Sequence, residues 1–210
     1  MSNRKKSTNS QSVSANKSER ILAAAYQLFM EHGDVDISIQ EIAERAGIAK
    51  GTVYLYFQDK EELKKSLITQ KSREFFQAAV DALHATDIVG LEEQMIFVIN
   101  YIINLLTQNP MALRLIAKNL SFGLFNQKLQ DYISDDSSDV MQAMLLAAGQ
   151  NGVQLRSPQV LLFMIIELTS STCFSCILES RPLPIQDYKP YLFETIRNMI
   201  RAATIYPKTA

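Results

Sequence analysis

Residues 38–63 read SIQEIAERAGIAKGTVYLYFQDKEEL, and this stretch predicts two short helices joined by a glycine turn. Ser38 can cap the first helix with its hydroxyl while Glu41 reaches back to the amide of Ser38, which is the pattern of a capping box. Apolar residues recur at helical spacing on the face expected to be buried, namely Ile39, Ile42, Ala43 and Ala46. Gly47 is expected to end this helix, because glycine adopts the left-handed conformation without steric cost.

The second helix is expected over about residues 50–57, with Val53 and Phe57 on its buried side. Its outer side and ends then carry small, basic and hydroxyl-bearing residues: Ala49, Lys50, Gly51, Thr52, Tyr54 and Tyr56. These side chains suit the major groove of DNA, since the lysine supplies charge, the hydroxyls donate hydrogen bonds and the small residues permit close approach. The alternative is a pair of amphipathic core helices with a solvated basic edge.

Residues 18–67 resemble the DNA-binding domain of the TetR family of bacterial transcription regulators. The family signature runs from a helix ending in LF-x-E-x-G to a Y-x-YF-x-x-K-x-x-L tail, matched here by Leu28, Phe29, Glu31 or His32, Gly33, Tyr54, Tyr56, Phe57, Lys60 and Leu63. The resemblance implies phosphate contacts at Ser38, Tyr54, Tyr56 and Lys60, and base or groove contacts at Gln40, Ala49, Lys50, Gly51 and Thr52. Ala49 departs from the polar residue often found at its position, so less base readout is expected there.

The composition favours an all-α fold. The 210 residues are 47% hydrophobic and 20% charged, enough to bury a substantial core, and apolar residues recur with helical spacing from Ile21 almost to the end. We expect a disordered basic leader at residues 1–17, a three-helix helix-turn-helix DNA-binding domain at 18–65, and a larger helical ligand-binding and dimerisation domain at 66–210.

The charge is unevenly distributed along the chain. Residues 1–73 hold 12 Lys and Arg against 9 Asp and Glu, whereas residues 74–210 hold 9 against 13. The N-terminal third is therefore the part expected to meet phosphates. Its leader lacks the apolar stretch of a signal peptide, and it can be either a solvated tail or a basic arm in the minor groove.

Further helices are expected over about residues 59–83, 88–107, 158–179 and 187–204. Asp59 and Ser157 are the expected caps of two of them, and Asn109 with Pro110 is expected to open a short helix. Another segment spans residues 122–149, where the run DDSSD at 135–139 can break a helix.

The segment 158–179 is the most apolar, with Glu167 as the one charged residue between positions 160 and 178. Its length is marginal for a membrane span, but hydroxyls fill its second half and no aromatic or basic belt flanks it. We therefore expect no membrane association and a helix covered by its neighbours and by a second subunit. The family resemblance implies a homodimer formed by the last two helices, with an interface at Leu161, Leu168, Ser171, Ser175, Tyr191, Ile196, Met199, Ile200 and Ala203.

No catalytic motif is recognisable in the larger domain, and we expect neither enzyme activity nor a cofactor or metal. Cys173 and Cys176 form a C-x-x-C pair inside an apolar helix, where buried small side chains are favoured over an oxidant sensor. The two histidines, His32 and His84, add no convincing metal site.

The larger domain is suited to holding an apolar compound between its helices. Candidate lining residues are Phe76, Phe97, Tyr101, Leu105, Phe122, Phe125, Phe163 and Glu167, each of which can equally be ordinary core. Glu167 needs a partner or a proton in so apolar a helix, and either a ligand amine or hydroxyl or Arg114 can serve.

These features predict a cytoplasmic, homodimeric, ligand-responsive transcription regulator, most simply a repressor. It would occupy a double-stranded, pseudo-palindromic DNA operator and leave it when a small apolar or amphipathic effector binds. The alternative is a small-molecule binding or sequestering protein without a DNA function.

Overall fold

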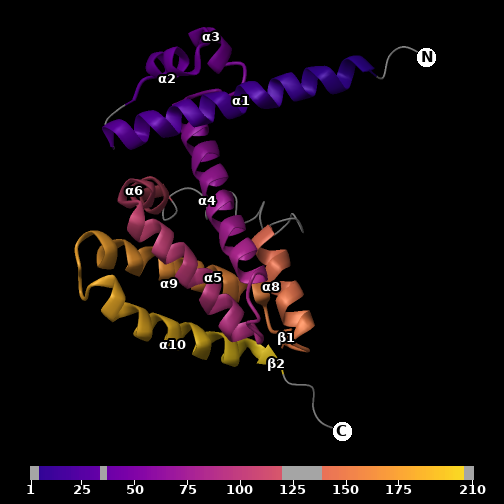
Figure 1. Ribbon diagram of the computed structural model, residues 1–210, viewed down its shortest axis with the longest axis vertical. Helices are drawn as coiled ribbons and strands as arrows, with labels where there is room; N and C mark the ends of the chain where they lie inside the picture. Colours follow the sequence, from indigo (N-terminus) through magenta and orange to yellow (C-terminus); the bar gives the residue numbers. More distant parts are fainter. Residues whose placement is uncertain (1–4, 34–36, 120–138, 206–210) are drawn as a thin grey trace. The chain divides into compact units, whose positions relative to one another are not determined.

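The computed structural model describes residues 5–33, 37–119 and 139–205, which are almost entirely helical (Figure 1). This confirms the all-α fold expected from the apolar periodicity. The backbone divides into two compact units, Met1–Gln70 and Lys71–Ala210, called here the smaller and the larger unit. The division falls within helix α4 (Lys60–His84), as does the boundary expected after residue 65.

The smaller unit contains α1 (Lys5–His32), α2 (Ile39–Ala46) and α3 (Lys50–Val53), followed by the first part of α4. Ile21 of α1 and Ile42 of α2 are almost fully buried where these two helices pack together. Arg20 donates a hydrogen bond to the carbonyl of Ala46 at 2.7 Å, and Arg45 forms a bidentate pair with Glu31 at 2.7 and 2.6 Å. Both links join α1 to the end of α2 that precedes the turn.

The start of α1 differs from the expectation. The helix begins at Lys5 and so includes residues 5–17, for which the sequence predicts a disordered leader. Ser, Asn, Gln and Lys each cost roughly 0.7 kcal/mol or less relative to alanine in a helix. A helix anchored by the buried Ile21 and Leu22 can therefore continue backward through a polar segment.

The end of α3 also differs, because the helix stops at Val53 and does not reach Phe57. The backbone turns more tightly beyond Val53, with Leu55 N donating to Thr52 O at 3.2 Å and Tyr56 N donating to Val53 O at 3.0 Å. Glycine and β-branched residues fill most of this short helix, and they favour helical conformation less than other residues do.

The larger unit contains the rest of α4, α5 (Leu91–Gln108), α6 (Pro110–Asn119), α8 (Asp139–Gln150), α9 (Pro158–Leu178) and α10 (Ile185–Ala203). A minimal antiparallel pair joins β1 (Gln154–Leu155) to β2 (Thr204–Ile205), next to α8 and α10 in sequence. The predicted helical segment at 122–149 is described only from residue 139, and Phe122 and Phe125 lie outside the described residues.

Two expected caps act differently from the prediction. Ser157 precedes α9 as expected, but it has a φ of 49° and its side chain makes no capping hydrogen bond. Asn109 precedes α6 as expected and its backbone carbonyl accepts from Leu113 N at 3.1 Å, but its side-chain amide donates back to Leu105 O of α5 at 3.0 Å. At both residues the chain turns from one element into the next without a capping hydrogen bond from the side chain to the following helix.

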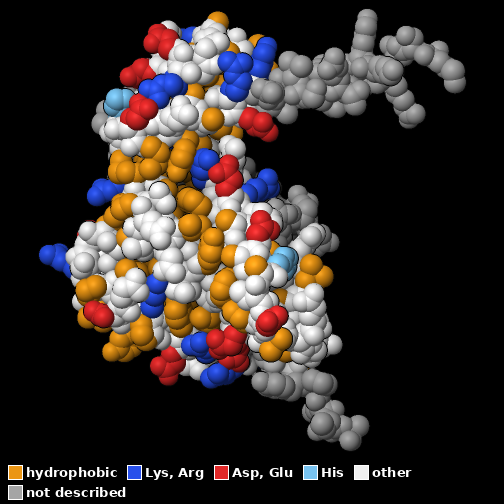
Figure 2. All heavy atoms as spheres, viewed as in Figure 1, with side chains coloured by type: hydrophobic (Ala, Val, Ile, Leu, Met, Phe, Trp, Pro, Cys, Tyr) orange, Lys and Arg blue, Asp and Glu red, His pale blue; other side chains and the backbone are white. Residues whose placement is uncertain are grey.

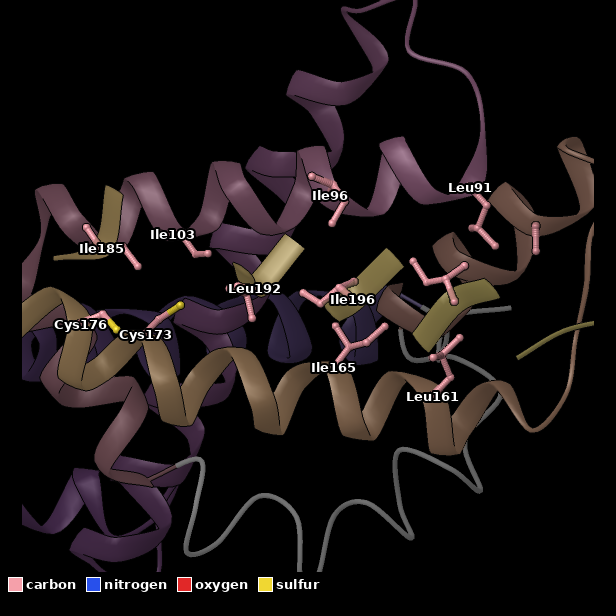
Figure 3. Packing of buried hydrophobic residues seen from close by; sticks show 12 residues of the cluster. Leu91, Ile96, Ile103, Leu161, Ile165, Cys173, Cys176, Ile185, Leu192 and Ile196 are labelled. Atoms are coloured by element: carbon pink, nitrogen blue, oxygen red, sulfur yellow. The ribbon is translucent and has the colours of Figure 1, made fainter. Parts of the chain in front are cut away.

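The core of the larger unit is formed where α5, α9 and α10 meet, as Figure 3 shows. Leu161 and Ile165 of α9 point toward Leu192 and Ile196 of α10. Arg197 and Arg201 of α10 pair with Glu93 and Glu92 of α5 at 2.9 and 2.7 Å. Figure 2 shows acidic and basic side chains gathered together at the lower end of this unit.

Three residues predicted for the dimer interface belong to this core instead. Leu161, Ile196 and Ile200 are 1%, 0% and 1% exposed within a single chain, so they have no surface left for a second subunit. Sequence periodicity shows that a helix has an apolar side but not which partner covers it. The outward residues of α9 include Val160 and Met164, which are 54% and 44% exposed.

Helix α9 remains more exposed than its composition suggests. Its mean hydropathy of 1.9 would suit a membrane span by length and composition, and 22% of that window is buried within the chain. The bent pair Leu91–Gln108 and Pro110–Ile116, at 114°, passes the same composition test together. An apolar helix with a buried side and an exposed side is the pattern of a subunit interface in a helical bundle.

Lys189 of α10 is buried among apolar residues at 8% exposure. Its Nζ donates to the Asn104 side-chain oxygen of α5 at 2.5 Å, and no carboxylate among the described residues pairs with it. Burial lowers the pKa of this amine below its usual 10.5. The folded chain therefore holds the proton of Lys189 less firmly than the unfolded chain does.

Gly47→Ala is expected to lower the stability of the smaller unit by about 1–2 kcal/mol, since alanine at a φ of 65° is strained. An added Cβ would lie 3.5 Å from Arg20, an ordinary contact, so the loss would come from the backbone. Gly51→Ala is the matched control, because it adds the same methyl to α3 in open space. Thermal unfolding followed by circular dichroism should show a loss for the first variant alone, and equal melting of both would contradict the reasoning.

Lys189→Met is expected to leave the chain as stable or about 1 kcal/mol more stable near neutral pH, because the variant buries no amine. The depressed pKa means that the unfolded chain binds the proton more tightly, so wild-type stability should rise as the pH approaches 10.5. Urea unfolding at several pH values should show the gap between the two proteins narrowing with rising pH. A constant gap would show that Lys189 does not titrate differently on folding.

Candidate nucleic-acid interface

The capping box predicted at the start of α2 is present. The Ser38 hydroxyl accepts from Glu41 N at 3.2 Å, while a Glu41 carboxylate oxygen accepts from Ser38 N at 2.8 Å and from the Ser38 hydroxyl at 2.7 Å. These hydrogen bonds hold the pKa of Glu41 below its usual range. The start of α2 is thus set by residues three positions apart in the sequence.

The turn after α2 depends on Gly47, whose φ of 65° lies in the left-handed region. Its N–H donates to Glu44 O at 3.1 Å, and Ile48 N donates to Ala43 O at 3.0 Å. The last carbonyls of α2 are thereby satisfied and the chain reverses within a few residues. This confirms the glycine turn that the sequence predicts.

Residues 49–57, which comprise α3 and its flanking residues, separate into an inward and an outward set. Val53 and Phe57 are 0% and 5% exposed, as predicted. The predicted DNA-contacting residues Ala49, Lys50, Gly51 and Tyr54 are exposed, and Thr52 and Tyr56 are partly so. The space above Gly51 is open, with no atom within 4 Å of a Cβ placed there. An ammonium group, hydroxyls and two small residues thus lie on one accessible surface, which we call the α3 surface.

The remaining predicted contact residues lie at the starts of α2 and α4. Ser38 and Gln40 are exposed, but both are engaged, since the Gln40 amide donates to Glu44 at 2.7 Å. Lys60 is half-buried and opens α4, whose start is capped as predicted by Asp59, which accepts from Glu62 N at 2.7 Å. A phosphate contact by Ser38 or a groove contact by Gln40 must therefore replace an existing hydrogen bond.

Leu55 was not among the predicted contact residues, yet it is 80% exposed directly after α3. A leucine in an amphipathic segment is usually expected to be buried, so residue type alone does not predict that Leu55 is exposed. The signal that could have found it is spacing, because position 55 lies midway between the inward-facing Val53 and Phe57.

The predicted ligand residues of the larger unit are only partly described. Phe76, Phe97, Tyr101, Leu105, Phe163 and Glu167 are half-buried, and the Phe97 and Tyr101 rings stack with centroids 6.2 Å apart. No hydrogen bond or ion pair within the described part of the chain engages the Glu167 carboxylate, and Arg114 is exposed and does not pair with it. A depression of about 260 Å³ lies elsewhere, beside Leu91, Glu93 and Ile200. The ligand site stays a prediction.

The C-x-x-C pair belongs to the core shown in Figure 3. Cys173 and Cys176 are 3% and 1% exposed and are not joined by a disulfide. Burial raises the pKa of the Cys173 thiol to about 12 and also raises that of Cys176, so both stay protonated at neutral pH. In the part of the chain that the structure covers, no three His, Cys, Asp or Glu side chains are grouped to hold a metal ion.

Comparisons with known proteins identify the smaller unit. Residues 21–67 match the family of bacterial regulatory proteins named tetR. The fatty acid metabolism regulator protein of Bacillus subtilis (strain 168) is 38% identical over 58 residues, covering 28% of this chain and 30% of that protein. An HTH-type transcriptional regulator of Staphylococcus aureus (strain USA300) is 26% identical over 180 residues, covering 83% and 89%. For the Bacillus subtilis fatty acid regulator and another curated relative, the matched segment spans less than half of that protein's length.

Solved structures share the fold over most of the chain. A tetR family regulator from Shewanella sp. PV-4 superposes with a TM-score of 0.64 at 17% identity, covering 90% of this chain and 99% of that one. FadR from Bacillus subtilis, solved with stearoyl-CoA, has a TM-score of 0.61 at 21% identity and covers 87% and 98%. The helix-turn-helix geometry and the family match identify residues 21–67 as a DNA-binding domain of the TetR family of bacterial regulatory proteins, and the solved structures show that most of the chain shares the fold of such regulators.

Proposed function

We propose that this chain is a homodimeric repressor that binds a pseudo-palindromic DNA operator through α2 and α3 and is released by a small apolar or amphipathic effector. The observation that carries the proposal is the division of residues 50–57, which form α3 and the turn after it: Val53 and Phe57 are buried while Lys50, Gly51 and Tyr54 are exposed. A recognition helix needs this division, because the inner residues hold it in place while the outer ones reach the groove.

Charge supports the assignment of the smaller unit to DNA. The smaller unit, residues 1–70, holds 10 Lys and Arg against 9 Asp and Glu, whereas the larger unit, residues 71–210, holds 11 against 13. Phosphate attraction supplies much of the affinity of DNA-binding proteins and orients the protein on the duplex. Within the interface, phosphate contacts are assigned to Ser38, Tyr54, Tyr56 and Lys60, and groove contacts to Gln40, Ala49, Lys50, Gly51 and Thr52.

A dimer is required to place two recognition helices about 34 Å apart in successive major grooves. The exposed side of α9 is the proposed seam, since Val160, Met164 and Ser171 follow one another at helical spacing and two of them are large and apolar. Of the interface residues predicted from sequence, Ser171 and Tyr191 are exposed and Leu168, Ser175, Met199 and Ala203 are half-buried, so these six remain candidates.

The effector would act by linkage. A compound that binds better when the two recognition helices are wrongly spaced for the operator must weaken operator affinity, and by reciprocity the operator weakens binding of the compound by the same factor. Helix α4 is the covalent connection between the two units and is the proposed lever. An apolar or amphipathic effector is favoured by the half-buried aromatic residues Phe76, Phe97 and Tyr101, and the Bacillus subtilis relative of the same fold binds stearoyl-CoA.

Tyr54→Ala and Lys60→Ala are each expected to weaken binding to all duplexes, while Thr52→Ala and Lys50→Ala are expected to change sequence preference. Fluorescence polarisation with the DNA that flanks the gene, measured over a range of salt concentrations, tests this. Removing the charge of Lys60 should also lower the slope of log affinity against log salt by about one for each phosphate that is no longer neutralised.

Arg73→Ala is the matched control, because it removes one exposed positive charge from the larger unit. It should leave affinity and salt slope nearly unchanged. Failure of the wild-type chain to bind at low salt, or unchanged affinity in all four interface variants, would end the proposal.

Met164→Glu is expected to convert the dimer to monomers, since it would place two carboxylates in an apolar seam. Leu146→Glu on α8 is the control, because Leu146 is also apolar and is 65% exposed but lies on another helix. Analytical ultracentrifugation should find the control dimeric and the Met164 variant monomeric. A dimeric Met164 variant would place the interface away from this side of α9.

A further inference from the structure

The most exposed apolar side chain of the smaller unit is Leu55. Among the described residues of that unit, the large apolar side chains left exposed are Tyr54 at 48% and Leu55 at 80%, which are neighbours directly after α3. Tyr54 has a hydroxyl that can serve a phosphate, but leucine can only make apolar contacts. A single exposed leucine is ordinary on a protein surface, so its position decides its significance.

The backbone holds Leu55 outward. Val53 and Phe57, two residues before and after it, are 0% and 5% exposed, and Phe57 N donates to Val53 O at 3.0 Å. Leu55 N donates to Thr52 O at 3.2 Å, which places Leu55 one turn beyond Thr52. With both flanking anchors buried, Leu55 cannot turn inward without undoing the packing of the unit. Leu55 therefore adds an apolar side chain to the α3 surface, directly after the end of α3.

The major groove offers one apolar group, the 5-methyl of thymine, and each base pair is otherwise distinguished there by hydrogen-bond donors and acceptors. We propose that Leu55 contacts a thymine 5-methyl group in each half-site and so sets the base preferred at that position. The proposal rests on the proposed DNA function and adds a specificity-determining residue to it. Removing one methyl from such a contact is expected to weaken binding about fourfold for each half-site.

The test begins with operators selected by the wild-type chain from a pool of random duplexes. Each thymine of a selected half-site is then replaced by 2′-deoxyuridine, which removes the 5-methyl group and keeps the pairing. Wild-type affinity should fall about fourfold at one thymine of the half-site, or about sixteenfold when both half-sites are changed. The Leu55→Ala variant should bind the thymine and deoxyuridine duplexes equally at that position.

Val89→Ala is the matched control, since Val89 is also 80% exposed and lies in the larger unit, and it should keep the full response to deoxyuridine. Because Leu55 is exposed, Leu55→Ala should have the same melting temperature as the wild-type chain. Equal melting temperatures distinguish an effect on DNA binding from a folding defect. A selection that yields no duplex would overturn the proposed function itself. A wild-type chain that binds but ignores every deoxyuridine, or a Leu55→Ala variant that keeps the response, would overturn the role of Leu55 alone.

Discussion

The reversal of the chain at Gly47 is the constraint on which the proposed DNA-binding surface depends. Its left-handed backbone lets α3 restart at an angle to α2, and hydrogen bonds from Gly47 and Ile48 satisfy the last carbonyls of α2. Arg20 holds the end of α2 from α1 by binding the carbonyl of Ala46. With the turn set, burial of Val53 and Phe57 is enough to leave Lys50, the small residues and Leu55 outward.

In the larger unit, the very apolar helix α9 has one side in the core and one side exposed. The inner side of α9 packs with α10 around Leu161, Ile165 and Ile196, while its outer side keeps Val160 and Met164 exposed. The buried thiols of Cys173 and Cys176 fill space in this packing and are held protonated by it. A helix of this kind needs cover on both sides, and the proposed dimer would supply the second cover.

Local signals in the sequence were sufficient for the caps and the turn of the smaller unit, and they were insufficient for the core of the larger one. The capping box of Ser38, the turn at Gly47 and the buried pair Val53 and Phe57 all arise from residues within four positions of each other. The assignment of Leu161 and Ile196 to a dimer interface failed because periodicity marks an apolar side without naming what covers it. The early start of α1 at Lys5 was missed because polar residues extend a helix at little cost.

The sequence by itself determined the all-α class, the positions of the turn and caps, and the kinship of residues 21–67 with the TetR family. It could do so because helical periodicity, capping and glycine geometry are properties of neighbouring residues. Only the tertiary structure decided which apolar side of α9 is core and that Leu55 is held outward. These depend on which side chains from distant parts of the chain arrive to exclude water, and no local pattern records that.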